Sequence, residues 1–144
     1  MNKKISISLL YLLILAGTAH AALRVTDLRT EQLKNPLGID IRHPRLGWRI
    51  ESDEQNVMQT AYHILVASSP ELLAQGKGDC WDSGKVKTDA SQWITYQGKT
   101  LKCNASYYWK VKIDTNKGAT NWSAPAFWTT GLFNEADWQG QWIG

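Results

Sequence analysis

Residues 107–114 alternate strictly between two kinds of side chain, and they constrain the fold more than any other stretch. One set is aromatic or aliphatic and comprises Tyr107, Trp109, Val111 and Ile113. The other set is mostly polar and comprises Tyr108, Lys110, Lys112 and Asp114. A period of two with aromatic and β-branched residues on one side is typical of a half-buried strand in an antiparallel sheet. Such a strand needs a second layer to cover its apolar face.

The residues just before this strand indicate how it begins. Leu101 lies six positions before Tyr107, and a polar turn separates the two. A leucine, a tight corner and a tyrosine heading a strand are typical of the tyrosine corner of sandwich domains, where the phenol hydroxyl bonds to upstream backbone. We therefore assign structural roles to Leu101 and Tyr107. The alternative is an ordinary amphipathic strand with a partly buried tyrosine.

Six further stretches have the composition of short strands, with turn signals between them. They are residues 22–30, 45–52, 59–68, 80–86, 91–96 and 127–130. Trp48 and Tyr62 are expected to meet Trp109 and its neighbours across the core, with Phe127 also facing inward. This pattern predicts an all-β fold, a seven-stranded antiparallel β-sandwich.

One helical turn is expected between the third and fourth strands. Ser69 is a good N-cap, Pro70 suits the first helical position, and Gly76 suits the end. A hairpin is expected at residues 116–118, where the sequence is Asn-Lys-Gly. Residues 132–144 differ from the rest, and we interpret them as a linker and the truncated start of a following domain.

The first 21 residues have the pattern of a secretory signal peptide. Lys3 and Lys4 precede an apolar run, and Ala19-His20-Ala21 provides a cleavage site. An uncleaved anchor is the alternative. Without these residues the 16 basic residues become 14, against 13 acids, so the net charge is 14 − 13 = +1. This balance argues against a nucleic-acid partner. The expected location is exported, either periplasmic or secreted, with no membrane association after cleavage.

Cys80 and Cys103 are the only cysteines. An exported protein permits a disulfide between them, and two free thiols are the alternative. No catalytic residue, metal ligand or cofactor is predicted. The acids of residues 53–89 lie mostly in predicted turns, where Asp caps backbone. His43 and His63 have no nucleophile or ligand partner at a telling spacing.

Eight tryptophans are the one compositional excess. Trp48 and Trp109 are expected in the core, and Trp138 and Trp142 are expected to contact a neighbouring domain. Exposed aromatic rings also stack on sugars, and Trp81 and Trp93 are the two candidates for sugar contact. Core packing is the alternative for both.

An ordered series of short motifs resembles a known family. It comprises Leu28-Arg29-Thr30-Glu31, Asn35-Pro36-Leu37-Gly38-Ile39-Asp40, Pro44-Arg45-Leu46-Gly47-Trp48, Gln59-Thr60-Ala61-Tyr62, Trp81-Asp82-Ser83-Gly84-Lys85-Val86, Tyr107-Tyr108-Trp109-Lys110-Val111 and Trp122-Ser123. Essentially all of residues 22–144 resembles the N-terminal fibronectin type III-like domain of bacterial α-L-rhamnosidases of glycoside hydrolase family 78. Residues 22–131 are the expected fibronectin type III-like β-sandwich.

This resemblance implies an exported enzyme that hydrolyses terminal α-L-rhamnosyl linkages with inversion. Its catalytic carboxylates would lie on a later (α/α)6 barrel that this chain does not contain. The implied partners are downstream domains of the same polypeptide and rhamnose-containing glycans. Two other readings stay open, a stand-alone carbohydrate-binding module and a protein-contact module, because fold alone does not settle function.

Overall fold

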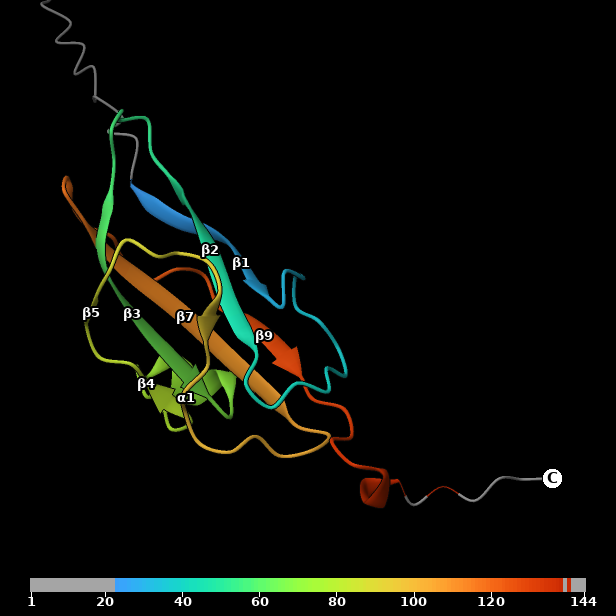
Figure 1. The fold of residues 1–144 in the computed structure, drawn as a ribbon. Helices are drawn as coiled ribbons and strands as arrows, with labels where there is room; N and C mark the ends of the chain where they lie inside the picture. Colours follow the sequence, from blue (N-terminus) through green and yellow to red (C-terminus); the bar gives the residue numbers. More distant parts are fainter. Residues whose placement is uncertain (1–22, 139, 141–144) are drawn as a thin grey trace, which may run out of the picture.

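The computed structural model describes residues 23–138 and Gly140, which form a two-layered β-sandwich (Figure 1). The predicted signal peptide and Trp142 lie outside the described residues. Within the described residues, no helix is long and apolar enough to cross a membrane.

The smaller sheet contains, in spatial order, β1 (Arg24–Thr30), β2 (Arg45–Glu51) and β6 (Ile94–Thr95). The larger sheet contains, in order, β4 (Trp81–Asp82), β3 (Gln59–Ala67), β7 (Ser106–Thr115) and β8 (Gly118–Ala119). In addition, β5 (Val86–Lys87) pairs with β3, and β9 (Ala126–Thr129) pairs with β7. All these pairings are antiparallel.

Strand β7 runs through the middle of the larger sheet and keeps the alternation read from the sequence. Its buried positions are Tyr107, Trp109, Val111, Ile113 and Thr115. The longest pairing joins β7 to β3, from Ala67↔Tyr108 to Gln59↔Thr115. Because β3 has neighbours on both sides, it is a central strand, which explains why both of its faces are apolar.

The main core lies between the two sheets. Trp48 on β2 is 1% exposed, and its ring meets Tyr62 edge-to-face at 5.4 Å. Trp109 is fully buried in the same cluster. The sequence predicts that Tyr62 faces β7 from across the core, and this is wrong. Tyr62 lies on β3, paired with Ile113 within the same sheet, so of these two aromatic residues Trp48 alone comes from the smaller sheet.

The described residues contain nine strands rather than the seven predicted. The predicted strand 80–86 divides into β4 and β5, because Gly84 turns the chain between them with φ +59°. The hairpin at Asn116–Gly118 is present and adds β8, which pairs with the end of β7. The predicted strand 91–96 shortens to β6, because Trp93 adopts a left-handed conformation with φ +60°.

The last strand presents a different face to the core from the one predicted. Trp128 and Ala126 are buried, whereas Phe127 is only half-buried. The register explains this difference, since Tyr107 pairs with Trp128 and Trp109 with Ala126. Directly paired residues share a face of the sheet, so β7 determines which residues of β9 point inward.

The outer face of the larger sheet carries the only α-helix among the described residues, α1 (Pro70–Ala74) (Figure 1). The Ser69 hydroxyl accepts a hydrogen bond from the Leu72 N–H at 3.3 Å, which caps the helix. Leu73 packs with Leu65 and Ala67 of β3 in a second, smaller cluster.

The tyrosine corner is present at the start of β7. The Tyr107 hydroxyl accepts a hydrogen bond from the Lys102 N–H at 2.7 Å, and Leu101 is buried beside it. The Tyr107 ring stacks on Trp128 at 5.4 Å. The corner therefore ties the loop before β7 to the core between the sheets.

Candidate functional site

The acidic residues of the sandwich act mainly as acceptors that hold the fold. Asp82 Oδ1 lies 2.6 Å from His63 Nε2 and accepts from the Gly84 N–H at 2.9 Å. Asp79 accepts from both the N–H and the hydroxyl of Ser68, at 2.9 and 2.6 Å. The hydrogen bonds from Gly84 and His63 lower the pKa of Asp82. A carboxyl of this kind stays ionised, whereas the general acid of a glycosidase needs a raised pKa.

Residues 23–138 and Gly140 contain no group of three or more His, Cys, Asp or Glu side chains placed to hold a metal ion. His43 instead has its Nδ1 at 3.2 Å from the Tyr96 carbonyl oxygen. His43 and Asp82 are thus both engaged in hydrogen bonds to neighbouring groups of the sandwich.

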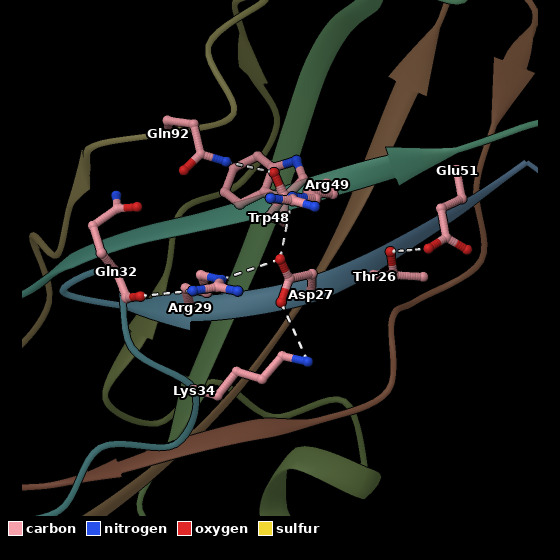
Figure 2. Close-up of polar contacts among 9 residues, drawn as sticks. All are labelled: Thr26, Asp27, Arg29, Gln32, Lys34, Trp48, Arg49, Glu51 and Gln92. Atoms are coloured by element: carbon pink, nitrogen blue, oxygen red, sulfur yellow. Dashed lines mark hydrogen bonds and ion pairs between the residues drawn. The ribbon is translucent and has the colours of Figure 1, made fainter.

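The most concentrated charge lies on the outer face of the smaller sheet, around Asp27 (Figure 2). Asp27 sits at a β-bulge in β1 with φ +49°. Its Oδ2 lies 3.1 Å from Arg29 Nε and 3.2 Å from Arg49 Nε, and its Oδ1 lies 3.4 Å from Lys34 Nζ. The hydrogen bond from Arg29 is the main cause that lowers the pKa of Asp27. The bulge thus turns one carboxylate toward three cations.

Two further ion pairs flank this cluster. Arg45 holds Glu31 through Nη2 at 2.7 Å, and Arg24 holds Glu51 through Nη2 at 2.7 Å. Four of the five arginines of the chain therefore lie on β1 and β2, namely Arg24, Arg29, Arg45 and Arg49. Arginine suits planar, multidentate contacts, so the composition of this face favours ion pairing.

Of the two candidates for sugar contact, the structure leaves Trp93 accessible. It is 55% exposed, and the Arg45 guanidinium lies over its ring at 4.5 Å. Gln92 anchors the preceding backbone by donating to the Trp48 carbonyl at 2.6 Å (Figure 2). Gly47 lies opposite this side chain, and a Cβ added there would lie 2.6 Å from the Gln92 amide oxygen and displace it.

Trp81 has a different environment. It is partly buried on β4 of the larger sheet and meets Tyr96 edge-to-face at 5.4 Å. Trp93 precedes β6 of the smaller sheet. The two rings therefore belong to different sheets, and Trp81 contributes to packing.

Both cysteines are free thiols in the structure. Cys103 Sγ donates to Asp137 Oδ2 at 3.2 Å. Burial raises the pKa of the Cys80 thiol, which therefore favours the protonated form. The sequence left open a disulfide or two free thiols, and the structure has two free thiols. Cys103 is directed toward Asp137 in the C-terminal turn.

Cys80 also lines an open cavity of about 520 Å³ at the end of the sandwich where β7 begins. Lys99, Lys102 and Asp79 contribute to its wall. Asp79 is already engaged by Ser68, and the two lysines are exposed. The wall of this cavity is mixed polar and apolar, and none of the three charged residues that line it is buried.

A second hollow of about 540 Å³ lies at the C-terminal end of the described chain. It is lined by Leu132, Phe133, Asn134, Glu135 and Trp138. Arg42 lies over the Phe133 ring at 4.6 Å and donates to the Asn134 side-chain oxygen at 3.3 Å. Trp138 is 64% exposed. This is the more apolar of the two surfaces.

A family model described as the Rha78A-like, N-terminal immunoglobulin domain matches residues 25–134. The chain belongs to this family. The Rha78A-like N-terminal domain thus spans both sheets and extends into the segment after β9.

Relatives of the domain are much longer proteins. The chain is 44% identical over 124 residues to an α-L-rhamnosidase of Streptomyces avermitilis, covering 85% of this chain and 12% of that protein. It is 40% identical over 111 residues to an α-L-rhamnosidase of Formosa agariphila, covering 76% of this chain and again 12% of the relative. The chain therefore spans about one eighth of these relatives.

Solved structures agree with this assignment. The crystal structure of the Streptomyces avermitilis α-L-rhamnosidase complexed with L-rhamnose matches with a TM-score of 0.80 at 43% identity, over 85% of this chain and 12% of that one. The α-L-rhamnosidase from Dictyoglumus thermophilum matches with a TM-score of 0.79 at 38% identity, over 83% and 14% of the two chains. Both similarities lie in a short part of a long chain.

Sequence reasoning did not find two of the residues that organise this domain. Tyr96 is 1% exposed, and its hydroxyl donates to the Lys99 carbonyl at 2.8 Å. Gln59 is a buried polar residue that bonds Trp48 across the core. Gln59 is out of phase with Tyr62, Ile64 and Val66, and it still reaches the core because the register of β3 shifts between Gln59 and Ala61.

Proposed function

We propose that this chain is the non-catalytic N-terminal module of an exported α-L-rhamnosidase that hydrolyses terminal α-L-rhamnosyl linkages. The proposal rests on how much of each relative this chain covers. A model of an N-terminal domain matches residues 25–134, and the part that matches is only 12% of each α-L-rhamnosidase. Catalysis would then belong to domains beyond this one. The module contributes a compact sandwich that packs against the rest of the polypeptide.

The acids of the module support a non-catalytic role. Wherever the pKa of a carboxyl group departs from its ordinary value, it is lowered. The groups are Asp27, Glu31, Glu51, Asp79, Asp82 and Asp137. An inverting glycosidase needs one carboxyl protonated and another ionised across the scissile bond. Ion pairs and backbone caps already occupy most of these groups.

The test is an assay of two proteins with an aryl α-L-rhamnoside. The purified 22–144 chain should give no turnover, and the full-length gene product should release the aryl group. Turnover by the 22–144 chain, or none by a folded full-length product, would contradict the proposal. Mass spectrometry of the exported product should find an N-terminus at Ala22, as cleavage of the signal peptide requires.

A stand-alone carbohydrate-binding module is the second candidate, and the exposure of Trp93 favours it. The ring is 55% exposed and is held in place by Arg45. Calorimetry of the 22–144 chain with rhamnose-containing oligosaccharides tests this reading. Binding that Trp93→Ala abolishes and Trp81→Ala leaves intact would favour it over the accessory role.

A further inference from the structure

The segment that follows β9 combines exposed apolar side chains with a firmly held backbone. We define the exit surface as Ile41, Arg42, Leu132, Phe133 and Trp138. Ile41 is 38% exposed and Trp138 is 64% exposed, while Leu132 and Phe133 line the hollow of about 540 Å³. Contiguous exposed apolar groups around a hollow mark an interaction site more often than isolated ones do.

Backbone hydrogen bonds hold both sides of the exit surface. The Gly131 N–H donates to the Ile39 carbonyl at 2.8 Å, and the Ile39 N–H donates to the Thr129 carbonyl at 2.9 Å. Ile39 and Thr130 form a parallel bridge. The loop that carries Ile41 and Arg42 therefore runs alongside the segment that carries Phe133.

Polar contacts fix the turn beyond this bridge. The Asn134 N–H donates to Asp137 Oδ2 at 3.0 Å, and Cys103 Sγ donates to the same oxygen at 3.2 Å. Arg42 lies over Phe133 and bonds Asn134. Polar groups thus attach η1 (Glu135–Asp137) to the sandwich, while Trp138 stays outside the core. A surface ordered in this way loses little conformational entropy when it is covered.

The exit surface also lies where the chain leaves the sandwich. In Figure 1 the chain passes from the end of β9 to η1, which lies beyond the end of the two sheets. The relatives continue for most of their length outside the matched part. A domain joined directly to this segment would meet the exit surface at high effective concentration, because tethering makes the contact intramolecular.

We infer that the exit surface is the docking site for the domain that follows on the same polypeptide. This inference rests on the proposed function, because it requires a polypeptide longer than this chain. The partner surface would insert apolar side chains into the hollow between Phe133 and Trp138. It would also present a carboxylate or carbonyl oxygen to Arg42, which forms no ion pair within 4 Å among the described residues.

Hydrogen exchange tests this inference in two proteins, the 22–144 chain and the full-length gene product. Amides of residues 132–138 should exchange at least about tenfold more slowly in the full-length product, since covering the turn removes its local opening. Trp138→Ser in the full-length product should return that exchange to the rate of the short chain. Equal exchange in the two unmodified proteins would overturn the inference.

Met58→Ser is the matched control. Met58 is 62% exposed and precedes β3, whose first residue pairs with Thr115 at the opposite end of β7. It should leave exchange at 132–138 unchanged, and an effect equal to that of Trp138→Ser would count against docking. Both variants of the short chain should keep its melting temperature, which separates loss of docking from loss of folding.

Two readouts separate this inference from the proposed function and from self-association. A full-length product that hydrolyses rhamnosides but shows no protection at 132–138 would overturn docking alone. A full-length product that shows slower exchange at 132–138 but does not hydrolyse rhamnosides would support docking and overturn the enzymatic proposal. Light scattering of the short chain should give a monomer. If the short chain instead forms a dimer that Trp138→Ser disrupts, the exit surface binds a second copy of the chain and not the following domain.

Discussion

The indole N–H of Trp48 donates to the side-chain oxygen of Gln59 at 3.0 Å, in the buried space between the two sheets. Trp48 belongs to the smaller sheet and Gln59 to the larger one. The amide nitrogen of Gln59 donates in turn to the carbonyls of Thr88 and Ala90, at 3.2 and 2.7 Å. One side chain thus joins both sheets to the loop after β5.

Replacement of Gln59 by leucine should therefore destabilise the domain strongly. The variant leaves the buried Trp48 N–H without its acceptor, and an unsatisfied buried group costs about 1–3 kcal/mol. It also removes the donor of the Thr88 and Ala90 carbonyls, which are only partly buried and add a smaller loss. We expect a loss of about 2–4 kcal/mol in the free energy of unfolding, measured by urea denaturation. Gln97→Leu, at an exposed position, is the control and should change stability little. A small loss in Gln59→Leu would show that water replaces the amide.

Removal of the Tyr107 hydroxyl tests the tyrosine corner. Tyr107→Phe leaves the ring in place and deprives the Lys102 N–H of its acceptor. The expected loss is about 1 kcal/mol, the usual contribution of such a bond. Tyr108→Phe on the opposite face of β7 is the matched control. Equal stability of the two variants would mean that the corner bond contributes nothing.

The inward face of β9 is tested by truncation of neighbouring aromatic residues. Trp128 is fully buried, so Trp128→Ala should cost about 3–5 kcal/mol. Phe127 is half-buried and packs on Tyr108 at 6.2 Å, so Phe127→Ala should cost clearly less. The reverse order in thermal unfolding would place Phe127 in the core and contradict the register of β9.

Acid should weaken the domain through its paired carboxylates. The hydrogen bond from Arg45 is the main cause that lowers the pKa of Glu31 below its ordinary value of 4.5. A lowered folded-state pKa gives stability that is complete above the unfolded-state pKa and is lost as pH falls through the folded-state pKa. The free energy of unfolding should stay level between about pH 5.5 and 8 and fall below about pH 4.5.

Glu31→Gln provides the check on this pH dependence. The amide cannot titrate, so the variant should show a shallower fall in unfolding free energy below about pH 4.5. It should also be less stable than the parent near neutral pH, because the pair with Arg45 is lost. A variant with the same acid slope as the parent would assign the pH dependence to the other carboxylates.

Local sequence patterns determined much of this domain. The alternation of 107–114 identified β7 and its buried face, because the side chains of a strand point alternately to its two sides. Ser69 and Pro70 located α1, because its cap and its first position depend on neighbouring residues alone. The spacing from Leu101 to Tyr107 indicated the corner bond for the same reason.

Contacts between distant segments decided the rest. Trp128 faces the core because β9 takes its register from β7, and a four-residue strand does not specify its own register. Trp93 is exposed because Gln92 and Ser91 bind β2 backbone and turn the chain out of the sheet. The Asp27 cluster and the exit surface likewise join residues far apart in sequence. The sequence by itself determined the strands, the helix cap and the corner, whereas only the tertiary structure decided which side chains meet, because long-range pairing is not encoded in local periodicity.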